Sequence, residues 1–236
     1  MSIRKVLRTI IALCVIITLS VAVLSCTQVT TAPGSTTTAA STTKPPITSP
    51  GTTITPAKTT TTTPVSQTDD LSFLIGDDPA NIDNAKLPIT PLEKIHVTGS
   101  PADYDINTYR LTLDGLVDNP LSLTYDYIKQ LPAVTQTVLL ICPGIFVDNA
   151  EWTGVPVTEL LDKAGVKDKA FEIIFYDGDQ YQKSFFIKDI VDAGAFLAYT
   201  VDGQVLPKEH GFPLRLVVKG QFGNTWVKWV NRIEIK

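Results

Sequence analysis

Forty-two consecutive residues of this chain, 27–68, offer very little from which a hydrophobic core could be built. They include 18 Thr, six Pro and four Ser, and their only charged residues are Lys44 and Lys58. A segment with so few large apolar side chains cannot bury enough surface to offset the entropy that a folded chain loses. We therefore predict a disordered, extended Thr/Pro-rich stalk over residues 26–68, and a folded domain confined to residues 69–236.

The segment before the stalk has the layout of an export signal. Residues 1–8 are basic, residues 10–24 form an apolar run, and Cys26 follows it directly. This order predicts a signal peptide over residues 1–25 that ends in a lipobox, with Cys26 lipidated. An uncleaved membrane anchor is the alternative, because the run is close to the length that spans a bilayer. Both interpretations place the domain at the cell membrane, on the extracytoplasmic face.

The charge of the folded part argues against one class of partner. All 24 acidic residues follow position 68, where only 15 basic residues stand, so residues 69–236 carry a net charge of −9. Nucleic-acid binding needs clustered positive charge. A domain with this net negative charge is therefore not expected to bind nucleic acid. The length of this part suits one domain with one core.

Short strands dominate the pattern of the domain. Residues 108–116 alternate apolar and polar side chains, and two Asp-Gly pairs, at 177–178 and 202–203, each lie between strand-like runs, as in hairpins. Short helices are predicted over 123–131 and, after Pro156, over 157–164. Further strands are predicted over 134–141, 214–218 and 226–235. No βαβ rhythm is sustained, so the fold class is α+β, with mixed or antiparallel sheets.

Cys142 is the first candidate for chemistry. It ends the apolar run 138–141 and is followed by Pro143-Gly144, which indicates a buried strand entering a tight turn. A buried free cysteine is often only a small apolar side chain. At a strand end, a thiolate can instead act as a nucleophile or as a metal ligand. The domain has too few Cys and His residues for a zinc site, so a single cysteine suffices only if the metal brings other ligands.

Two later segments predict an anion pocket. His210-Gly211-Phe212-Pro213-Leu214-Arg215 precedes an apolar strand, and its arginine offers a fork of donors for phosphate or carboxylate. A Gly-rich segment with Gly223 then leads to Lys228. Taken singly, each segment is better interpreted as a solvated turn followed by an edge strand, and only the two together, in a domain with a net charge of −9, predict the pocket.

Two further residues, His96 and Tyr199, do not by themselves predict a functional site. His96 lies in a polar loop before the first strand, where a surface histidine is the default. Tyr199 alternates with apolar neighbours and reads as a core aromatic residue whose hydroxyl reaches a partner.

Several of these motifs, in this order, resemble the molybdopterin-binding domain of the sulfite oxidase family. They are Cys142-Pro143-Gly144, the string Asn149-Ala150-x-Trp152-x-Gly154-Val155-Pro156, and HGFPLRLVV from His210, and the resemblance runs from about residue 92 onward. It implies a sulfite-oxidase-type molybdopterin-binding fold with molybdenum–molybdopterin as cofactor. It also implies residue roles: Cys142 as molybdenum ligand, Tyr199 in the active site, and His96, His210, Arg215, Gly223 and Lys228 as cofactor contacts.

The chain departs from the family pattern where an anionic substrate would bind. Lys94 and Ile95 replace an arginine and an asparagine, and Ile145-Phe146-Val147 replace basic residues after the cysteine. These changes argue against sulfite. The other domains of sulfite oxidases have no counterpart here, which implies a separate redox partner.

The sequence therefore predicts a lipid-anchored, molybdopterin-dependent oxidoreductase that acts on a small substrate by oxygen-atom or electron transfer. Two alternatives stay open. The first is a cofactor-free surface binding module on the same fold, and the second is a thiol-based enzyme.

Overall fold

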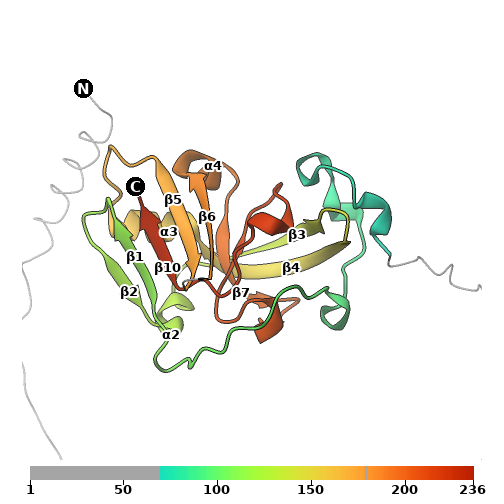
Figure 1. The fold of residues 1–236 in the computed structure, drawn as a ribbon, viewed down its shortest axis with the longest axis horizontal. Coiled ribbons are helices and arrows are strands. Elements are labelled where there is room, and N and C mark those ends of the chain that lie inside the picture. Colours follow the sequence, from blue (N-terminus) through green and yellow to red (C-terminus); the bar gives the residue numbers. More distant parts are fainter. Residues whose placement is uncertain (1–69, 179) are drawn as a thin grey trace, which may run out of the picture. The chain divides into compact units, whose positions relative to one another are not determined.

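The computed structural model describes residues 70–178 and 180–236 (Figure 1). The predicted signal peptide, Cys26 and the stalk lie outside the described residues. Within the described part, no helix is long and apolar enough to cross a bilayer.

The first sheet has five strands in the order β2-β1-β10-β5-β6. They are β1 (Leu111–Gly115), β2 (Leu121–Leu123), β5 (Glu172–Asp177), β6 (Tyr181–Phe186) and β10 (Arg232–Ile235). Strands β1 and β10 pair in parallel, and the other pairs are antiparallel. The parallel pair joins segments more than a hundred residues apart in sequence, so this sheet closes only when the end of the domain is in place.

The second sheet has β3 (Val134–Cys142), β4 (Phe146–Pro156), β7 (Phe196–Val201) and β8 (Gln204–Val205) in sequence order, and β9 (Arg215–Val217) also pairs with β7. All of these pairs are antiparallel. Figure 1 shows β3 and β4 as the long strands that extend from the first sheet toward the segment at residues 70–95.

The helices are short. They are α2 (Tyr125–Ile128), α3 (Val157–Ala164) and α4 (Ile187–Asp192), with 3-10 turns η1 (Ser72–Leu74), η2 (Pro79–Asn81), η3 (Asn84–Lys86), η4 (Leu92–Lys94), η5 (Lys208–His210) and η6 (Gly223–Thr225). Helix α3 begins after Pro156, whose missing N–H removes no helical hydrogen bond there. It ends at Gly165, which has a left-handed φ of 68° that glycine adopts without strain.

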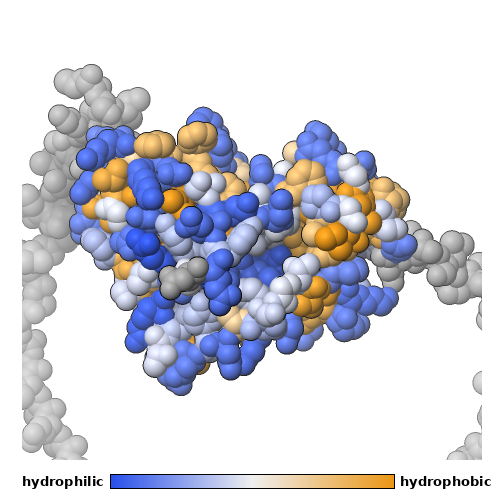
Figure 2. All heavy atoms as spheres, in the orientation of Figure 1, coloured by the Kyte–Doolittle hydropathy of each residue, from blue (hydrophilic) through white to orange (hydrophobic). Residues whose placement is uncertain are grey.

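The main core lies between the sheets and includes the fully buried Trp152, Phe175 and Phe196. A smaller cluster forms on the other face of β3 and β4, where Leu139, Ile141 and Val147 pack against Leu71 and Leu74. The two clusters follow from the period-2 alternation of strand side chains. Apolar side chains are also exposed at Phe171 and Phe186. Figure 2 shows hydrophobic residues at the top of the molecule, in the region where Figure 1 draws α4.

The predicted α+β class, with mixed sheets and short helices, is confirmed. Both hairpins form, and Asp202 and Gly203 have the positive φ angles of 48° and 72° that a tight hairpin turn favours.

Several boundaries were predicted wrongly. Leu123 ends β2 rather than opening a helix, and residues 226–231 form a loop before β10. Strand β4 and helix α4 were not predicted.

Candidate functional site

Cys142 is the last residue of β3, as the sequence predicted. A turn follows at once, in which the Ile145 N–H donates to the Cys142 carbonyl over 3.0 Å and Gly144 has a φ of +74°. The thiol is free and half-buried, and burial raises its pKa. A nucleophilic cysteine needs the opposite shift, toward the thiolate, so these surroundings argue against the thiol-enzyme alternative.

Asp148 shares a face of the sheet with Cys142. Its strand neighbours Phe146 and Ala150 belong to the main core cluster, so the alternation of β4 directs Asp148 to that same side. The register pairs Cys142 with Phe146 and Leu140 with Asp148. The carboxylate of Asp148 is fully buried. The sequence alone assigned this residue no role.

His96 is bound to this face through Asp148. Its ring Nδ1 lies 2.9 Å from Asp148 Oδ1, and its backbone N–H donates to Asp148 Oδ2 over 2.9 Å. The imidazole also stacks on Phe146, with ring centroids 4.6 Å apart and planes 7° from parallel. His96 is therefore fixed beside the end of β3, and its side chain is exposed there, as expected for a surface histidine.

Asn149 points to the other face and has a structural role. Its side-chain NH₂ donates to the carbonyls of Asn84, Leu87 and Pro88, each over 3.3 Å, and its Oδ1 accepts from the Asn84 amide over 3.0 Å. These bonds fix the segment at residues 84–90 against β4. Asn149 belongs to a family motif, but its contacts are with this segment rather than with a site.

Arg215 begins β9 and is buried, with 6% of its surface exposed. Its guanidinium lies beside two indoles that contact each other, 5.2 Å from the ring centre of Trp152 and 5.6 Å from that of Trp226. One terminal N–H donates to the His210 carbonyl over 3.0 Å, whereas Nε has no partner among the described residues. Burial lowers the pKa of Arg215 to about 10, and Asp148 partly opposes that shift.

His210 precedes Arg215 in a loop shaped by Gly211, which has a φ of +117°. A Cβ on Gly211 would lie 3.1 Å from Arg215 Cβ and 3.2 Å from Lys228 Cβ, so glycine allows these segments to meet. His210 is 5% exposed, and its Nδ1 is buried without a partner among the described residues. Burial, together with Arg215 and Lys228, lowers the pKa of His210 to about 4.

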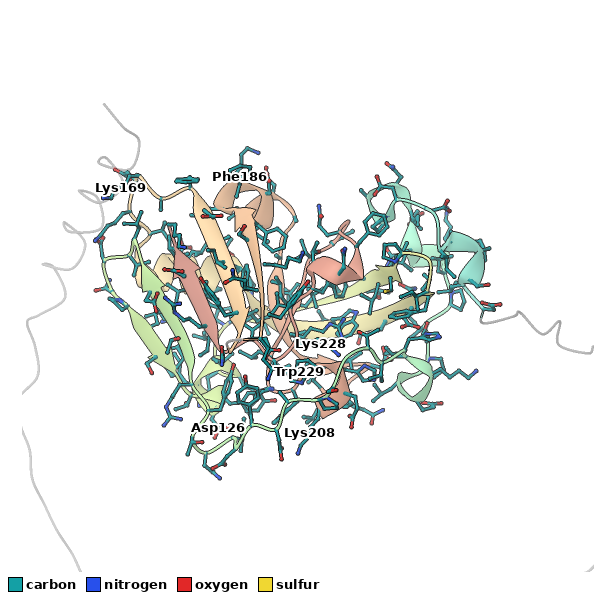
Figure 3. All side chains as sticks on the ribbon, viewed as in Figure 1. Asp126, Lys169, Phe186, Lys208, Lys228 and Trp229 are labelled. Carbon is teal, nitrogen blue, oxygen red and sulfur yellow. The ribbon has the colours of Figure 1, made fainter. Side chains whose placement is uncertain are left out.

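Lys228 completes this group. Its ammonium donates to the Glu209 carbonyl over 3.0 Å and to the Thr98 carbonyl, and it lies 4.2 Å from the centre of the Trp229 ring. Figure 3 labels Lys228 and Trp229, which lie next to each other near the middle of the view. Burial, followed by repulsion from Arg215, lowers the pKa of Lys228 to about 8.

A cavity of about 420 Å³ adjoins Lys228. Its walls come from both ends of the domain: the loop at Thr98–Ser100, the β5–β6 hairpin at Asp177, Gln180 and Tyr181, and the segment from Gly223 to Trp229. Gly223 is also close to β3, because a Cβ there would lie 2.6 Å from the Leu140 side chain. Cys142, His210, Arg215 and Tyr199 do not line this cavity.

Tyr199 lies at an irregularity of β7. Thr200 pairs with Thr153 and Ala198 with Gly154, so Tyr199 has no partner on β4. Such a bulge redirects a side chain and often occurs beside an active site. The tyrosine contributes to the raised pKa of Tyr125, about 12, for which burial is the larger cause. Tyr199 is thus near Arg215, which pairs with Ala198, but no contact between Tyr199 and Cys142 is seen.

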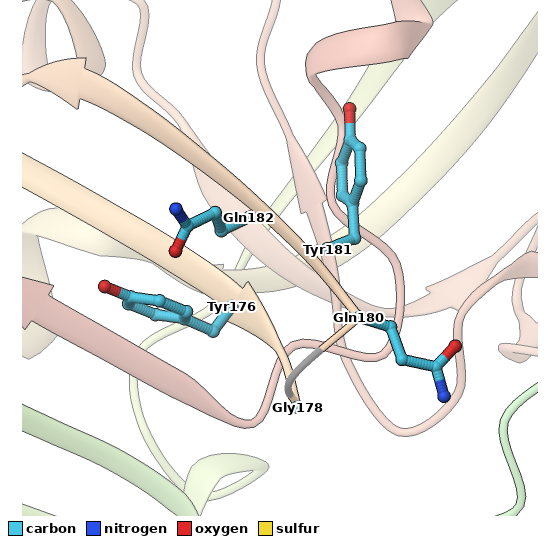
Figure 4. Close-up of a pocket in the computed structure, with 5 residues that line it drawn as sticks. All are labelled: Tyr176, Gly178, Gln180, Tyr181 and Gln182. Carbon is cyan, nitrogen blue, oxygen red and sulfur yellow. The ribbon is translucent and has the colours of Figure 1, made fainter.

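The pocket in Figure 4 is separate from these residues. It has a volume of about 380 Å³ and is lined by Tyr176, Gly178, Gln180, Tyr181 and Gln182. Tyr176 and Gln182 are register partners on the outward face of the first sheet. The Tyr181 side chain turns away from them, and its hydroxyl donates to the Asn224 carbonyl over 2.5 Å. None of the predicted site residues lines this pocket.

Arg215, Lys228 and His210 together form a buried corner that suits an anion. Arg215 lies close enough to Lys228 to lower the affinity of Lys228 for a proton, and His210 Nδ1 and Arg215 Nε lack partners among the described residues. Buried polar groups are ordinarily hydrogen-bonded, so a phosphate with several acceptor oxygens would satisfy this set. Nor does the described part contain three or more His, Cys, Asp or Glu side chains grouped to hold a metal. A metal at Cys142 would therefore need most of its ligands from a cofactor.

Comparison with known protein families decides the assignment. Residues 97–236 match the model described as the oxidoreductase molybdopterin binding domain. This chain belongs to that family. Cys142, Tyr199, His210, Arg215, Gly223 and Lys228 lie inside the matched range, and His96 lies one residue before it.

Relatives within the family have varied activities. The chain is 29% identical over 147 residues to "Uncharacterized oxidoreductase YuiH" of Bacillus subtilis, covering 61% of this chain and 74% of that protein. It is 30% identical over 193 residues to the mitochondrial sulfite oxidase of Macaca fascicularis, covering 65% of this chain and 35% of that one. It is 29% identical over 161 residues to the NADH nitrate reductase of Ulva prolifera, covering 54% of this chain and 19% of that one.

The fold has a solved counterpart. The structure of the sulfane dehydrogenase SoxCD from Paracoccus pantotrophus matches with a TM-score of 0.60 at 30% identity, over 67% of this chain and 45% of that one. The predicted sulfite-oxidase-type fold is therefore confirmed. The family uses molybdenum–molybdopterin, which confirms the predicted cofactor, and the residues of the buried corner fit its phosphate. The roles of single residues stay predictions.

Proposed function

We propose that this protein is a lipid-anchored, extracytoplasmic molybdopterin-dependent oxidoreductase that transfers an oxygen atom or electrons to or from a small substrate. The observation that carries the proposal is the buried corner of Arg215, Lys228 and His210, whose charge and unpaired atoms fit a phosphate. A corner that served only as core would gain nothing from a buried arginine and a half-buried lysine without an anion.

Each residue has a proposed task. Arg215, Lys228 and His210 hold the cofactor phosphate, and Gly223 lets the backbone come close to the cofactor. His96 contacts the pterin, and Cys142 gives a thiolate to the metal; because burial raises the pKa of this thiol, ligation releases a proton. When bound, molybdopterin supplies a metal centre that exchanges oxygen atoms or electrons with a substrate.

The turn after Cys142 favours a substrate with little negative charge. Ile145 is 66% exposed, Phe146 is 6% exposed, and the next side chain on that face is the buried carboxylate of Asp148. A dianion such as sulfite would be desolvated there without a nearby cation from this turn, which is costly. We therefore propose a small, uncharged substrate.

The location and the partner rest on the sequence. The basic start, the apolar run and Cys26 support export and lipidation, and both placements lie outside the described residues. The chain spans 35% of the sulfite oxidase that it matches. Membership of an oxidoreductase family supports a redox protein as the proposed electron partner.

Elemental analysis tests the function directly. The protein purified from its own membrane is expected to contain about one molybdenum per domain. Cys142→Ser should lose the sulfur-to-molybdenum charge-transfer band and the activity while circular dichroism stays unchanged. Thr135→Ser, a conservative change on the exposed part of the same strand, is the matched control and should keep both.

Two results would overturn the proposal. A cleanly folded, natively exported protein with far less than stoichiometric molybdenum would favour the cofactor-free binding module. Full activity in Cys142→Ser would mean that the thiol is only a core side chain.

A further inference from the structure

Asp148 is a fully buried carboxylate whose ion-pair partner is a histidine that is largely exposed. The side chain of His96 is 55% accessible, whereas that of Asp148 is 0% accessible. Both carboxylate oxygens are used: Oδ1 faces the His96 ring Nδ1 and Oδ2 accepts the His96 backbone N–H, each over 2.9 Å. Burying a carboxylate is costly, and a packing role alone would be served better by an apolar side chain at this position.

The carboxylate determines which ring nitrogen carries hydrogen. An ionised carboxylate only accepts hydrogen bonds, so Nδ1 of His96 must donate to it. The other nitrogen, Nε2, makes no hydrogen bond to any residue of the described part. The neutral ring therefore offers Nε2 as an acceptor.

The position of the ring is fixed as well as its tautomer. Stacking on Phe146 holds the imidazole plane, and Phe146 is the register partner of Cys142. Two independent contacts, one polar and one aromatic, thus hold His96 beside the strand end that carries the thiol. This arrangement is typical of a positioned ligand contact rather than of a surface histidine.

We propose that Asp148 is a positioning residue, which holds His96 as the Nδ1–H tautomer so that Nε2 accepts a hydrogen bond from an N–H group of the pterin bound next to Cys142. This inference rests on the proposed function, since it needs the cofactor. It adds a residue that is required for the cofactor contact without touching the cofactor.

Asp148→Asn makes the inference testable, because two donors face this side chain and an amide has only one acceptor oxygen. If that oxygen keeps the His96 backbone N–H, the NH₂ group faces Nδ1, which must then accept. The ring hydrogen moves to Nε2, and the acceptor offered to the pterin is lost.

The first measurement follows the tautomer by ¹H–¹⁵N correlation of the imidazole rings in full-length, cofactor-free protein. The chain has two histidines, His96 and His210, so His96→Gln assigns both signals. The wild type is expected to show His96 as Nδ1–H and Asp148→Asn to show it as Nε2–H, with His210 unchanged. A wild-type His96 in the Nε2–H form would overturn the inference even if the variant failed to fold.

The second measurement follows the cofactor. The dissociation constant for molybdopterin, measured from its release by purified holoprotein at equilibrium, is expected to be about 10- to 100-fold higher in Asp148→Asn. This is the usual loss of affinity when an outer-shell partner is removed. Asp202→Asn is the matched control: Asp202 accepts a backbone N–H from Glu151 over 2.9 Å but contacts no histidine. Asp202→Asn should retain the cofactor as the wild type does.

The outcomes separate the inference from the proposed function. A tautomer change without any loss of cofactor beyond the Asp202→Asn control would overturn the positioning role and leave the oxidoreductase proposal intact. If the wild type binds no molybdopterin, both proposals fail, and the Nδ1–H signal then marks a purely structural pair.

Discussion

His210 and Lys228 each have a proton affinity set by the cations and the burial around them. The pKa of His210 falls from 6.5 to about 4 and that of Lys228 from 10.5 to about 8. In both cases the folded protein disfavours the charged form. The protein without an anion therefore carries an electrostatic penalty at this corner, and that penalty depends on pH.

For His210, the sign of the pH dependence follows from linkage. Between pH 6.5 and about 4 the unfolded chain binds a proton at this residue and the folded protein does not. Its contribution to stability is complete above pH 6.5 and is lost as the pH falls toward 4. Urea unfolding at several pH values should show a steeper loss in the wild type than in His210→Gln. Equal slopes would contradict this assignment.

For Lys228, the prediction concerns anion binding. Phosphate binding to cofactor-free protein should weaken as the pH rises through about 8, because the ammonium loses its proton there. Lys228→Arg should keep its charge and still bind at pH 9, since arginine stays protonated. Calorimetric titration with inorganic phosphate measures this directly. Binding that is independent of pH up to 9 in the wild type would show that Lys228 does not face the anion.

At this scale the sequence was informative where a motif concentrates unusual residues. Cys142, His210 and Arg215 stand in recognisable strings that contain Gly and Pro, and Lys228 follows a Gly-rich segment. Asp148 could not be assigned a role in the same way, because its partner His96 is 52 residues away. The signal that was available is the alternation of Phe146, Asp148, Ala150 and Trp152, which would have placed Asp148 on the core face of a strand.

At the scale of elements, the contact between β4 and β7 leaves no room at Gly154. A Cβ there would lie 2.0 Å from the Leu197 carbonyl oxygen, at the irregularity that sets Tyr199 apart. Gly154→Ala should therefore lower the free energy of unfolding by about 3 kcal/mol. Urea denaturation measures the change. Gly76→Ala is the control, since nothing lies within 4 Å of a Cβ at that position.

A second element-scale prediction concerns the segment at residues 70–92. Asn149 holds this segment by hydrogen bonds to three of its carbonyls. Asn149→Ala should cost about 2 kcal/mol, because buried acceptors lose their donor. In Asn149→Ala the segment should also become sensitive to limited proteolysis. In the control variant Asn107→Ala, which changes an exposed asparagine outside the segment, the segment should stay resistant. A protected segment in Asn149→Ala would mean that the apolar contacts of Leu71 and Leu74 suffice.

The elements themselves were predictable to different extents. The two Asp-Gly hairpins were predicted correctly because their turn chemistry is local. Residues 226–231 looked like a strand because they are rich in Trp and Val, which favour strands. In the structure Trp229 has a positive φ of 56°, and the Trp226 and Trp229 indoles donate to carbonyls of neighbouring loops. Tertiary contacts thus override the local pattern.

At the scale of the whole molecule, the tether is the prediction open to test. Cys26→Ala should move the protein from the membrane fraction to the soluble fraction after signal processing, because one lipid-modified cysteine is the proposed anchor. The molybdenum content and unfolding midpoint of the domain should not change. Variant protein that stays with the membrane would favour an uncleaved anchor over lipidation.

The α+β class could be predicted, whereas the pairing of the sheets could not. The parallel contact of β1 with β10 and the separate cluster behind β3 and β4 depend on long-range packing, for which a single sequence gives no local signal.

The walls of the 420 Å³ cavity include both Thr98 and Trp229. During synthesis the ribosome has to deliver nearly the whole domain before the last wall of this cavity exists. A molecule that fills the cavity can therefore be enclosed only by a complete domain.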